Sequence, residues 1–134
     1  MIEVEIDSIR VSLMSEHRVI VLKALVEELY LPIWIGPYEA ESITIALQEI
    51  EVSRPQTHDL IKNLFGELDV QLIRVVISEL KDDIFYGTLV LNENGEEILV
   101  DSRPSDAIAI AVRSHVPIMV AAAVMDEASI VPEE

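Results

Sequence analysis

VDSRPSDAIAIAVR, residues 100–113, decides the fold, because it converts a strand-like run into an apolar helix within a few residues. Ala and Ile alternate from Ala107 to Ala111, so the helix that follows Pro104 has almost no polar face. A helix that is apolar nearly all round is typical of a buried element. We therefore predict a central helix over residues 104–115, with a sheet curved around it.

The turn that opens this helix carries two carboxylates, two hydroxyls and a guanidinium between residues 101 and 106. Ser102, Ser105 and Asp106 can be explained as groups that cap the first helical turn. Asp101 and Arg103 exceed what capping requires, and polar groups beside a buried helix are costly to keep. This excess indicates a functional centre at the turn.

Length and composition predict one domain over residues 1–134, because a chain of this size with 51% hydrophobic residues can bury a core of its own. The chain has no cysteine, which excludes disulfides and thiolate metal sites. The apolar run over residues 116–125 is interrupted by Pro117 and is shorter than the ~20 residues of a membrane span. A strand-like segment follows Met1 directly, so we expect no signal peptide, a cytoplasmic location and no membrane partner.

The charge balance works against simple nucleic-acid binding. Nine Lys and Arg face 25 Asp and Glu, giving a net charge of −16. Such a field repels polyanions unless it is locally inverted, and binding modules for nucleic acids normally use basic residues to displace counterions. Aromatic residues, at 4%, are too sparse for an extensive stacking platform.

Hydrophobic periodicity predicts an α+β fold built from two related units of three strands and a helix. The expected strands cover residues 2–13 with a bulge at Asp7-Ser8, then 18–26, 29–35, 68–72, 85–91 and 97–100, the last two joined by an Asn94-Gly95 turn. Two helices are expected over residues 39–50 and 104–115, and a further helix is expected to begin after Thr57, which would be its N-cap.

Short matches between the two halves of the chain suggest an internal duplication. The repeats would cover about 1–66 and 67–125 and would place Asp106 opposite Glu41. The result would be a half-barrel-like sheet around the central helix, followed by an acidic tail, 126–134, that is frayed or used at a subunit contact.

Five segments in order along the chain resemble the bifunctional nuclease domain family. They are LPIWIG at 31–36, EA at 39–40, RPQTHDL at 54–60, FYGTL at 85–89 and DSRPSDAI at 101–108. The resemblance covers nearly the whole chain and is carried by the ordered set. It implies a strongly curved sheet around a helix, and a nuclease that cleaves both DNA and RNA with little sequence specificity.

Several residues of these segments suit phosphodiester cleavage, which needs an activated nucleophile, charge stabilisation and a proton for the leaving oxygen. Arg54 and Arg103 each precede a proline that opens a helix, where a guanidinium can bind a phosphate beside helix amides. His58 can exchange a proton near neutral pH. The predicted catalytic residues are Arg54, His58, Asp59, Arg103, Ser105 and Asp106.

An acidic protein can bind a polyanion through a divalent cation that inverts the local potential. The predicted ligands for such a cation, Mg²⁺ or Mn²⁺, are Asp101, Asp106 and Glu41. With only three scattered histidines, zinc hydrolysis is not indicated.

Each candidate also has a structural explanation. Asp59, Asp106 and Glu41 occupy first turns, where acids complement the helix dipole, and Arg103 can pair with a neighbouring carboxylate. The alternative function is therefore a non-catalytic module that uses the same turn to bind an anion or a protein partner. The edge strands of an open sheet favour a homodimer or a higher homo-oligomer in either case.

Overall fold

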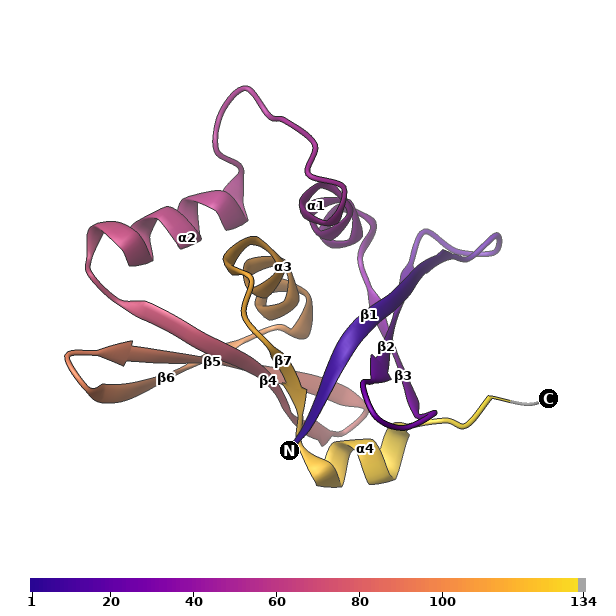
Figure 1. The fold of residues 1–134 in the computed structure, drawn as a ribbon. Helices are drawn as coiled ribbons and strands as arrows, with labels where there is room; N and C mark the ends of the chain where they lie inside the picture. Colours follow the sequence, from indigo (N-terminus) through magenta and orange to yellow (C-terminus); the bar gives the residue numbers. More distant parts are fainter. Residues whose placement is uncertain (133–134) are drawn as a thin grey trace.

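A seven-stranded sheet curves around helix α3 in the computed structural model, which describes residues 1–132 (Figure 1). The strands are β1 (Ile2–Val11), β2 (Arg18–Ala24), β3 (Tyr30–Ile35), β4 (Gln71–Lys81), β5 (Ile84–Glu93), β6 (Glu96–Ser102) and β7 (Ile118–Val120). The helices are α1 (Pro37–Leu47), α2 (Thr57–Glu67), α3 (Pro104–Ser114) and α4 (Ala122–Ala128). The strand order is β3-β2-β1-β7-β4-β5-β6, so the predicted α+β class with a curved, open sheet is confirmed.

The short strand β7 joins two antiparallel meanders into one sheet. Its three residues pair antiparallel with Ile2–Val4 of β1 and parallel with Val75–Ile77 of β4. Helices α1, α2 and α3 lie on one side of the sheet and α4 on the other (Figure 1). Both meanders therefore send a helix, α1 or α3, onto the same concave face.

Helix α3 is the centre of the core, as predicted. Every residue from Ala107 to Ala111 is buried, and α3 packs against α1, α2, β4 and β5. Its alanines allow these elements to approach closely, while Ile108 and Ile110 fill the space between them. A polar group at the first turn of α3 is thereby held on a rigid, buried support.

Two local predictions are also confirmed. The pairing of β1 with β2 shifts register between Ile6 and Ser8, which is the expected bulge. Asn94 and Gly95 adopt positive φ angles of 52° and 87° between β5 and β6, as a two-residue hairpin turn requires.

The predicted strand over residues 68–72 is wrong in its first half. Leu68 caps the C-terminus of α2 and Asp69 has a positive φ of 55°, so β4 begins only at Gln71.

The first residues of α1 and α3 change the predicted alignment of the two halves of the chain. Pro37 and Pro104 each open a helix, which places Glu39, and not Glu41, at the position equivalent to Asp106. The duplication itself stays a prediction.

The first part of the acidic tail is ordered, because residues 126–128 belong to α4. Val124 and Met125 of this helix are buried. Beyond it, the Ile130 N–H donates to the Tyr30 carbonyl at 2.7 Å and the Tyr30 N–H donates to the Ile130 carbonyl at 2.9 Å. The tail is therefore not frayed in this part, and its use at a subunit contact stays a prediction. Residues 133 and 134 lie outside the described chain. Over residues 1–132, no helix combines the length and apolarity needed to cross a membrane.

Candidate active site

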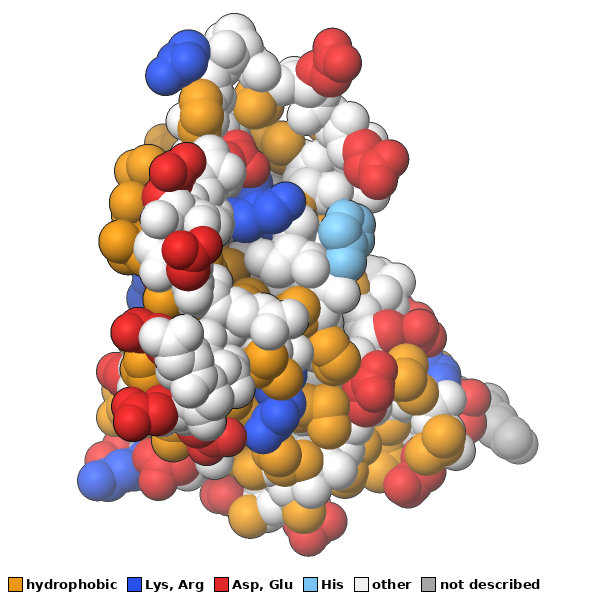
Figure 2. Space-filling model, turned by 60° about the vertical axis from the view of Figure 1, so that its left-hand side comes forward, with side chains coloured by type: hydrophobic (Ala, Val, Ile, Leu, Met, Phe, Trp, Pro, Cys, Tyr) orange, Lys and Arg blue, Asp and Glu red, His pale blue; other side chains and the backbone are white. Residues whose placement is uncertain are grey.

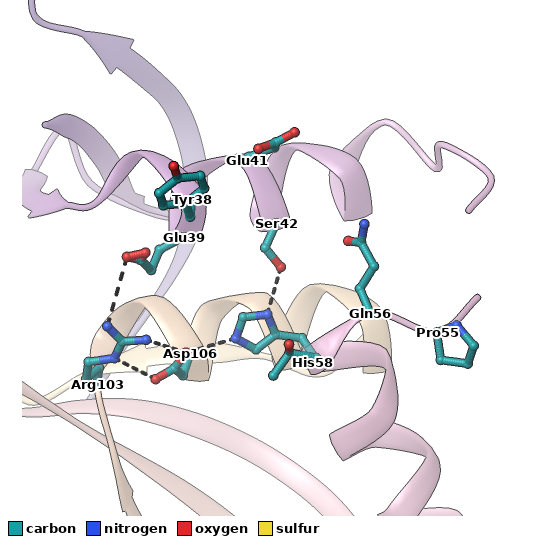
Figure 3. A pocket seen from close by; sticks show the side chains of 10 residues that line it. Tyr38, Glu39, Glu41, Ser42, Pro55, Gln56, His58, Arg103 and Asp106 are labelled. Carbon is teal, nitrogen blue, oxygen red and sulfur yellow. Dashed lines mark hydrogen bonds and ion pairs between the residues drawn. The ribbon is translucent and has the colours of Figure 1, made fainter. Parts of the chain in front are cut away.

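The first turns of α1, α2 and α3 surround a pocket of about 580 Å³, which we call the three-helix pocket (Figure 3). Its lining comprises Tyr38, Glu39, Glu41, Ser42, Pro55, Gln56, Thr57, His58, Arg103 and Asp106. The lining comes from segments that lie far apart in the sequence, and only the packing of α1 and α2 on α3 brings them together.

His58 is the central side chain of the pocket and is only 8% exposed. Its Nε2 lies 2.9 Å from Asp106 Oδ1, and its Nδ1 lies 2.7 Å from Ser42 Oγ (Figure 3). One imidazole therefore links all three helices.

The first turn of α2 holds His58 in place. Asp59 Oδ2 accepts a hydrogen bond from the Gln56 N–H at 2.9 Å, which closes this turn. The N-cap residue is Gln56, so the prediction of Thr57 as N-cap is wrong by one residue. His58 is thus the second helical residue, and it is the buried residue of α2.

The hydrogen-bond network favours one tautomer of a neutral His58. Arg113 Nη2 donates to Ser42 Oγ at 3.2 Å, which leaves the Ser42 proton available for His58 Nδ1. An ionised Asp106 can only accept, so Nε2 is the nitrogen that carries the proton. The chain of donors then runs from Ser42 through His58 to Asp106.

Arg103 and Asp106 form a bidentate ion pair at the start of α3. Arg103 Nε and Nη2 lie 2.8 and 3.1 Å from the two carboxylate oxygens of Asp106. Burial would raise the pKa of Asp106, but the hydrogen bonds from Arg103 and His58 outweigh it and hold this pKa below its ordinary value. Asp106 is therefore a fixed negative charge beside the imidazole.

Arg103 itself remains open to solvent, with a side chain that is 65% exposed. Its Nη1 lies 4.0 Å from Glu39 Oε1 (Figure 3). Gly87 of β5 pairs with Ser102, and a Cβ there would lie 2.9 Å from Ser102 Oγ and 3.2 Å from the Arg103 carbonyl. Glycine therefore permits the close approach of β5 that places Arg103 at the edge of the pocket.

Asp59 and Arg113 support the site outside the pocket lining. Arg113, with a side chain only 6% exposed, donates through Nε to Asp59 Oδ1 at 2.7 Å and through Nη1 to the Ala109 carbonyl at 3.0 Å. Burial would raise the pKa of Asp59, but the Gln56 N–H and Arg113 outweigh it and lower this pKa. The structure thus places Asp59 in a scaffold ion pair between α2 and α3.

The structure brings His58, Arg103 and Asp106 together, but not the other predicted catalytic residues. Arg54 is exposed in the α1–α2 connection and is absent from the pocket lining. Ser105 is buried and lines a neighbouring hollow of about 340 Å³, together with Arg103. Of the two arginines that precede prolines, Arg103 therefore lines the three-helix pocket and Arg54 does not, although its neighbour Pro55 does.

The three predicted metal ligands are also separated. Asp106 and Glu41 line the three-helix pocket, whereas Asp101 is an exposed residue of β6 that pairs with Thr88. Within residues 1–132, no three His, Asp or Glu side chains are grouped so that they could hold a metal ion. Asp106 is already engaged by Arg103 and His58, so these residues do not form a ready ligand set.

Ser42 was missed by the sequence reasoning. It lies inside α1, where a serine carries no capping or motif signal. The available clue was its spacing of three residues from Glu39, which puts both on one helical face. Its partner His58 is 16 residues away, so only the tertiary structure reveals the pair.

Comparison with known proteins shows the family of the chain. The sequence profile of the bifunctional nuclease domain matches residues 20–133, and the chain belongs to this family. An uncharacterized protein of Mycobacterium tuberculosis is 42% identical over 133 residues, which is 98% of this chain and 79% of that protein. Every residue of the three-helix pocket lies inside the matched range.

Plant relatives of the chain carry a functional name. A protein named bifunctional nuclease 1 from Oryza sativa subsp. indica is 34% identical over 110 residues, and bifunctional nuclease 2 from Arabidopsis thaliana is 30% identical over 112 residues. Each alignment covers 79% of this chain and 33% of the plant protein. The chain thus corresponds to about a third of the length of these relatives.

Proposed function

We propose that the three-helix pocket hydrolyses phosphodiester bonds in nucleic acids. The observation that carries the proposal is the position of His58, between the Ser42 hydroxyl and the ionised Asp106 and close to the exposed Arg103. Membership of the bifunctional nuclease domain family and the names of the plant relatives support the same reaction.

His58 and Asp106 supply the proton transfer. The imidazole takes a proton through Nδ1, and the Asp106 carboxylate at Nε2 stabilises the cation that forms. Asp106 is ionised near neutral pH, because Arg103 and His58 keep its pKa low despite burial. A properly placed acid–base group of this kind contributes about 10²–10⁴-fold to a rate.

Arg103 supplies the phosphate contact. Its Nε and Nη2 are engaged by Asp106, whereas the contact of Nη1 among residues 1–132 is the one at 4.0 Å with Glu39. Arg103 precedes the first turn of α3, so a phosphate at Nη1 would also meet the positive end of that helix. The guanidinium therefore neutralises the charge that develops on the non-bridging oxygens.

The surface charge limits how tightly the substrate binds. Carboxylate side chains are spread over the face shown in Figure 2, with few basic side chains between them. The pocket itself has one arginine and the carboxylates of Glu39, Glu41 and Asp106. We therefore expect weak binding of both DNA and RNA without sequence preference, because the proposed contact is with phosphate, which carries no base information.

Assistance of the reaction by Mg²⁺ or Mn²⁺ stays a prediction. Because the described residues offer no ready ligand set, no step of the proposed reaction is assigned to a metal. Cleavage measured in EDTA and with added Mg²⁺ or Mn²⁺ tests this assistance, and equal rates in all three conditions would contradict it.

Replacing Arg103 tests the proposed site against its neighbour. We expect Arg103→Ala to lower kcat/KM for a labelled single strand by about 10–100-fold, because one charge-assisted contact with phosphate contributes about 1.5–3 kcal/mol. Arg54→Ala is the matched control, since Arg54 also precedes a proline but does not line the pocket. KM should rise in the Arg103 variant only. An equal loss of kcat/KM in both variants would contradict the role of Arg103 in the three-helix pocket.

A homo-oligomeric binding module remains the second candidate function. Both carboxylate oxygens of Asp106 accept hydrogen bonds from Arg103 or His58, as expected of a group that only ties helices together. The outer face of α2 exposes Leu60, Leu64 and Leu68, which form an apolar surface for self-association. Sedimentation at micromolar concentration measures self-association. An oligomer that cuts no substrate would favour this candidate, and an active monomer would eliminate it.

A further inference from the structure

We propose that Ser42 is the nucleophile of the three-helix pocket and that hydrolysis passes through a phosphoseryl intermediate. This inference rests on the proposed phosphodiester hydrolysis and names the group that attacks phosphorus. It starts from the 2.7 Å hydrogen bond between Ser42 Oγ and His58 Nδ1.

Both nitrogens of His58 already have protein partners. Nε2 faces Asp106 at 2.9 Å and Nδ1 faces Ser42, and the side chain has little access to solvent. A water molecule could be activated by this ring only after it displaced one of these partners. The proton that the imidazole is placed to accept is therefore the hydroxyl proton of Ser42.

Arg113 favours ionisation of the same hydroxyl. Its Nη2 lies 3.2 Å from Ser42 Oγ, and its guanidinium is buried, so its charge is poorly screened by water. Negative charge that develops on Oγ as its proton leaves is thus stabilised by a group that is already in place. Arg113 is also fixed by Asp59 and the Ala109 carbonyl, so little reorganisation is needed.

The other hydroxyls near the pocket lack these contacts. Ser102 Oγ is buried with no hydrogen-bond partner among the described residues, and Ser105 lines the neighbouring hollow. Thr57 and Tyr38 line the pocket, but neither side chain makes a hydrogen bond with His58 within residues 1–132. Ser42 is therefore the hydroxyl that combines a base, a stabilising cation and access to the pocket.

The reaction balances in two displacements. In the first, Ser42 Oγ bonds to phosphorus, its proton passes to His58 Nδ1, and the bond from phosphorus to one sugar oxygen breaks as that oxygen takes the proton. In the second, water attacks the phosphoserine, gives a proton to Nδ1, and the bond between phosphorus and Oγ breaks as Oγ regains the proton. One water is consumed, and Asp106 stays ionised throughout.

The stereochemical course at phosphorus tests this inference on the unaltered protein. A strand with a single phosphorothioate linkage of one configuration is cleaved in ¹⁸O-labelled water, and the configuration of the product is determined. Two displacements at phosphorus predict retention, whereas direct attack by water gives inversion. Inversion would overturn the role of Ser42 and leave the hydrolase proposal intact, while a wild-type protein that cuts no substrate would overturn both.

Substitution of Ser42 provides the second measurement. We expect Ser42→Ala to lower kcat at least about 10³-fold, as loss of a nucleophile does, with a melting temperature close to that of the wild type. Thr44→Val is the matched control and should keep the wild-type kcat. Thr44 lies on the same helix, but its hydroxyl donates to the Ala40 carbonyl at 2.9 Å and does not contact His58. A Ser42→Ala protein whose kcat falls by less than about 10³-fold would refute the proposal.

Discussion

His58→Gln should slow cleavage of a labelled strand by about 10²–10⁴-fold, which is the usual contribution of an acid–base group. Glutamine can keep hydrogen bonds with Ser42 and Asp106, but it cannot accept and return a proton in the reaction. The loss should therefore appear in kcat, with little change in KM. Rates measured under saturating and limiting substrate separate these two quantities.

His17 offers the control for this substitution. Its Nδ1 also lies close to a serine, at 2.8 Å from Ser15 Oγ, but the pair is exposed in the turn between β1 and β2. We expect His17→Gln to cleave at the wild-type rate. If both variants kept full activity, His58 would have a structural role only.

Asp59→Ala should lower the free energy of unfolding by about 3 kcal/mol, because it leaves Arg113 as a buried cation without its counterion. The substitution also removes the acceptor of the Gln56 N–H at the start of α2. Urea unfolding at pH 7 measures the free energy of unfolding of both proteins. The control Glu67→Ala, at the exposed end of the same helix, should change this free energy by no more than about 0.5 kcal/mol.

The pH dependence of this difference follows from the lowered pKa of Asp59. A carboxyl whose pKa is lower in the folded state stabilises the fold above its unfolded pKa of about 3.9 and loses this effect as the pH falls. The gap between wild type and Asp59→Ala should therefore narrow below about pH 4. A gap that is absent at pH 7, or that widens on acidification, would show that the ion pair does not stabilise the protein.

The parts of the fold that were predicted correctly have local signals in the sequence. The alternating Ala and Ile of α3 and the positive φ required at Asn94-Gly95 are properties of a few neighbouring residues. Strand β7 has no such signal, because three apolar residues become a strand only when β1 and β4 pair with them. Local pattern also fails to predict the start of β4. Apolar and polar residues alternate from Leu68 to Leu72, but the turn at Asp69 keeps the first residues of this run out of the strand.

The candidate site was predicted in part for the same reason. Arg103 and Asp106 are three residues apart at the start of one helix, so their pairing can be anticipated from sequence. Ser42 and His58 meet through the packing of α1 and α2 on α3, and this packing also pairs Asp59 with Arg113. The rotation of each helix about its axis decides which polar residues line the pocket and which form ion pairs behind it. The sequence pattern alone does not set that rotation.

The cleavage rates of Asp106→Asn and Asp101→Asn, measured side by side with their melting temperatures, test the three-helix pocket most directly. Both acids belong to the same segment, but only Asp106 contacts His58 and Arg103, while Asp101 lies exposed on β6. If the three-helix pocket carries out cleavage, Asp106→Asn lowers the rate by about 10²–10⁴-fold and Asp101→Asn stays within about twofold of the wild-type rate. Equal rates in the two variants would contradict that role of the pocket.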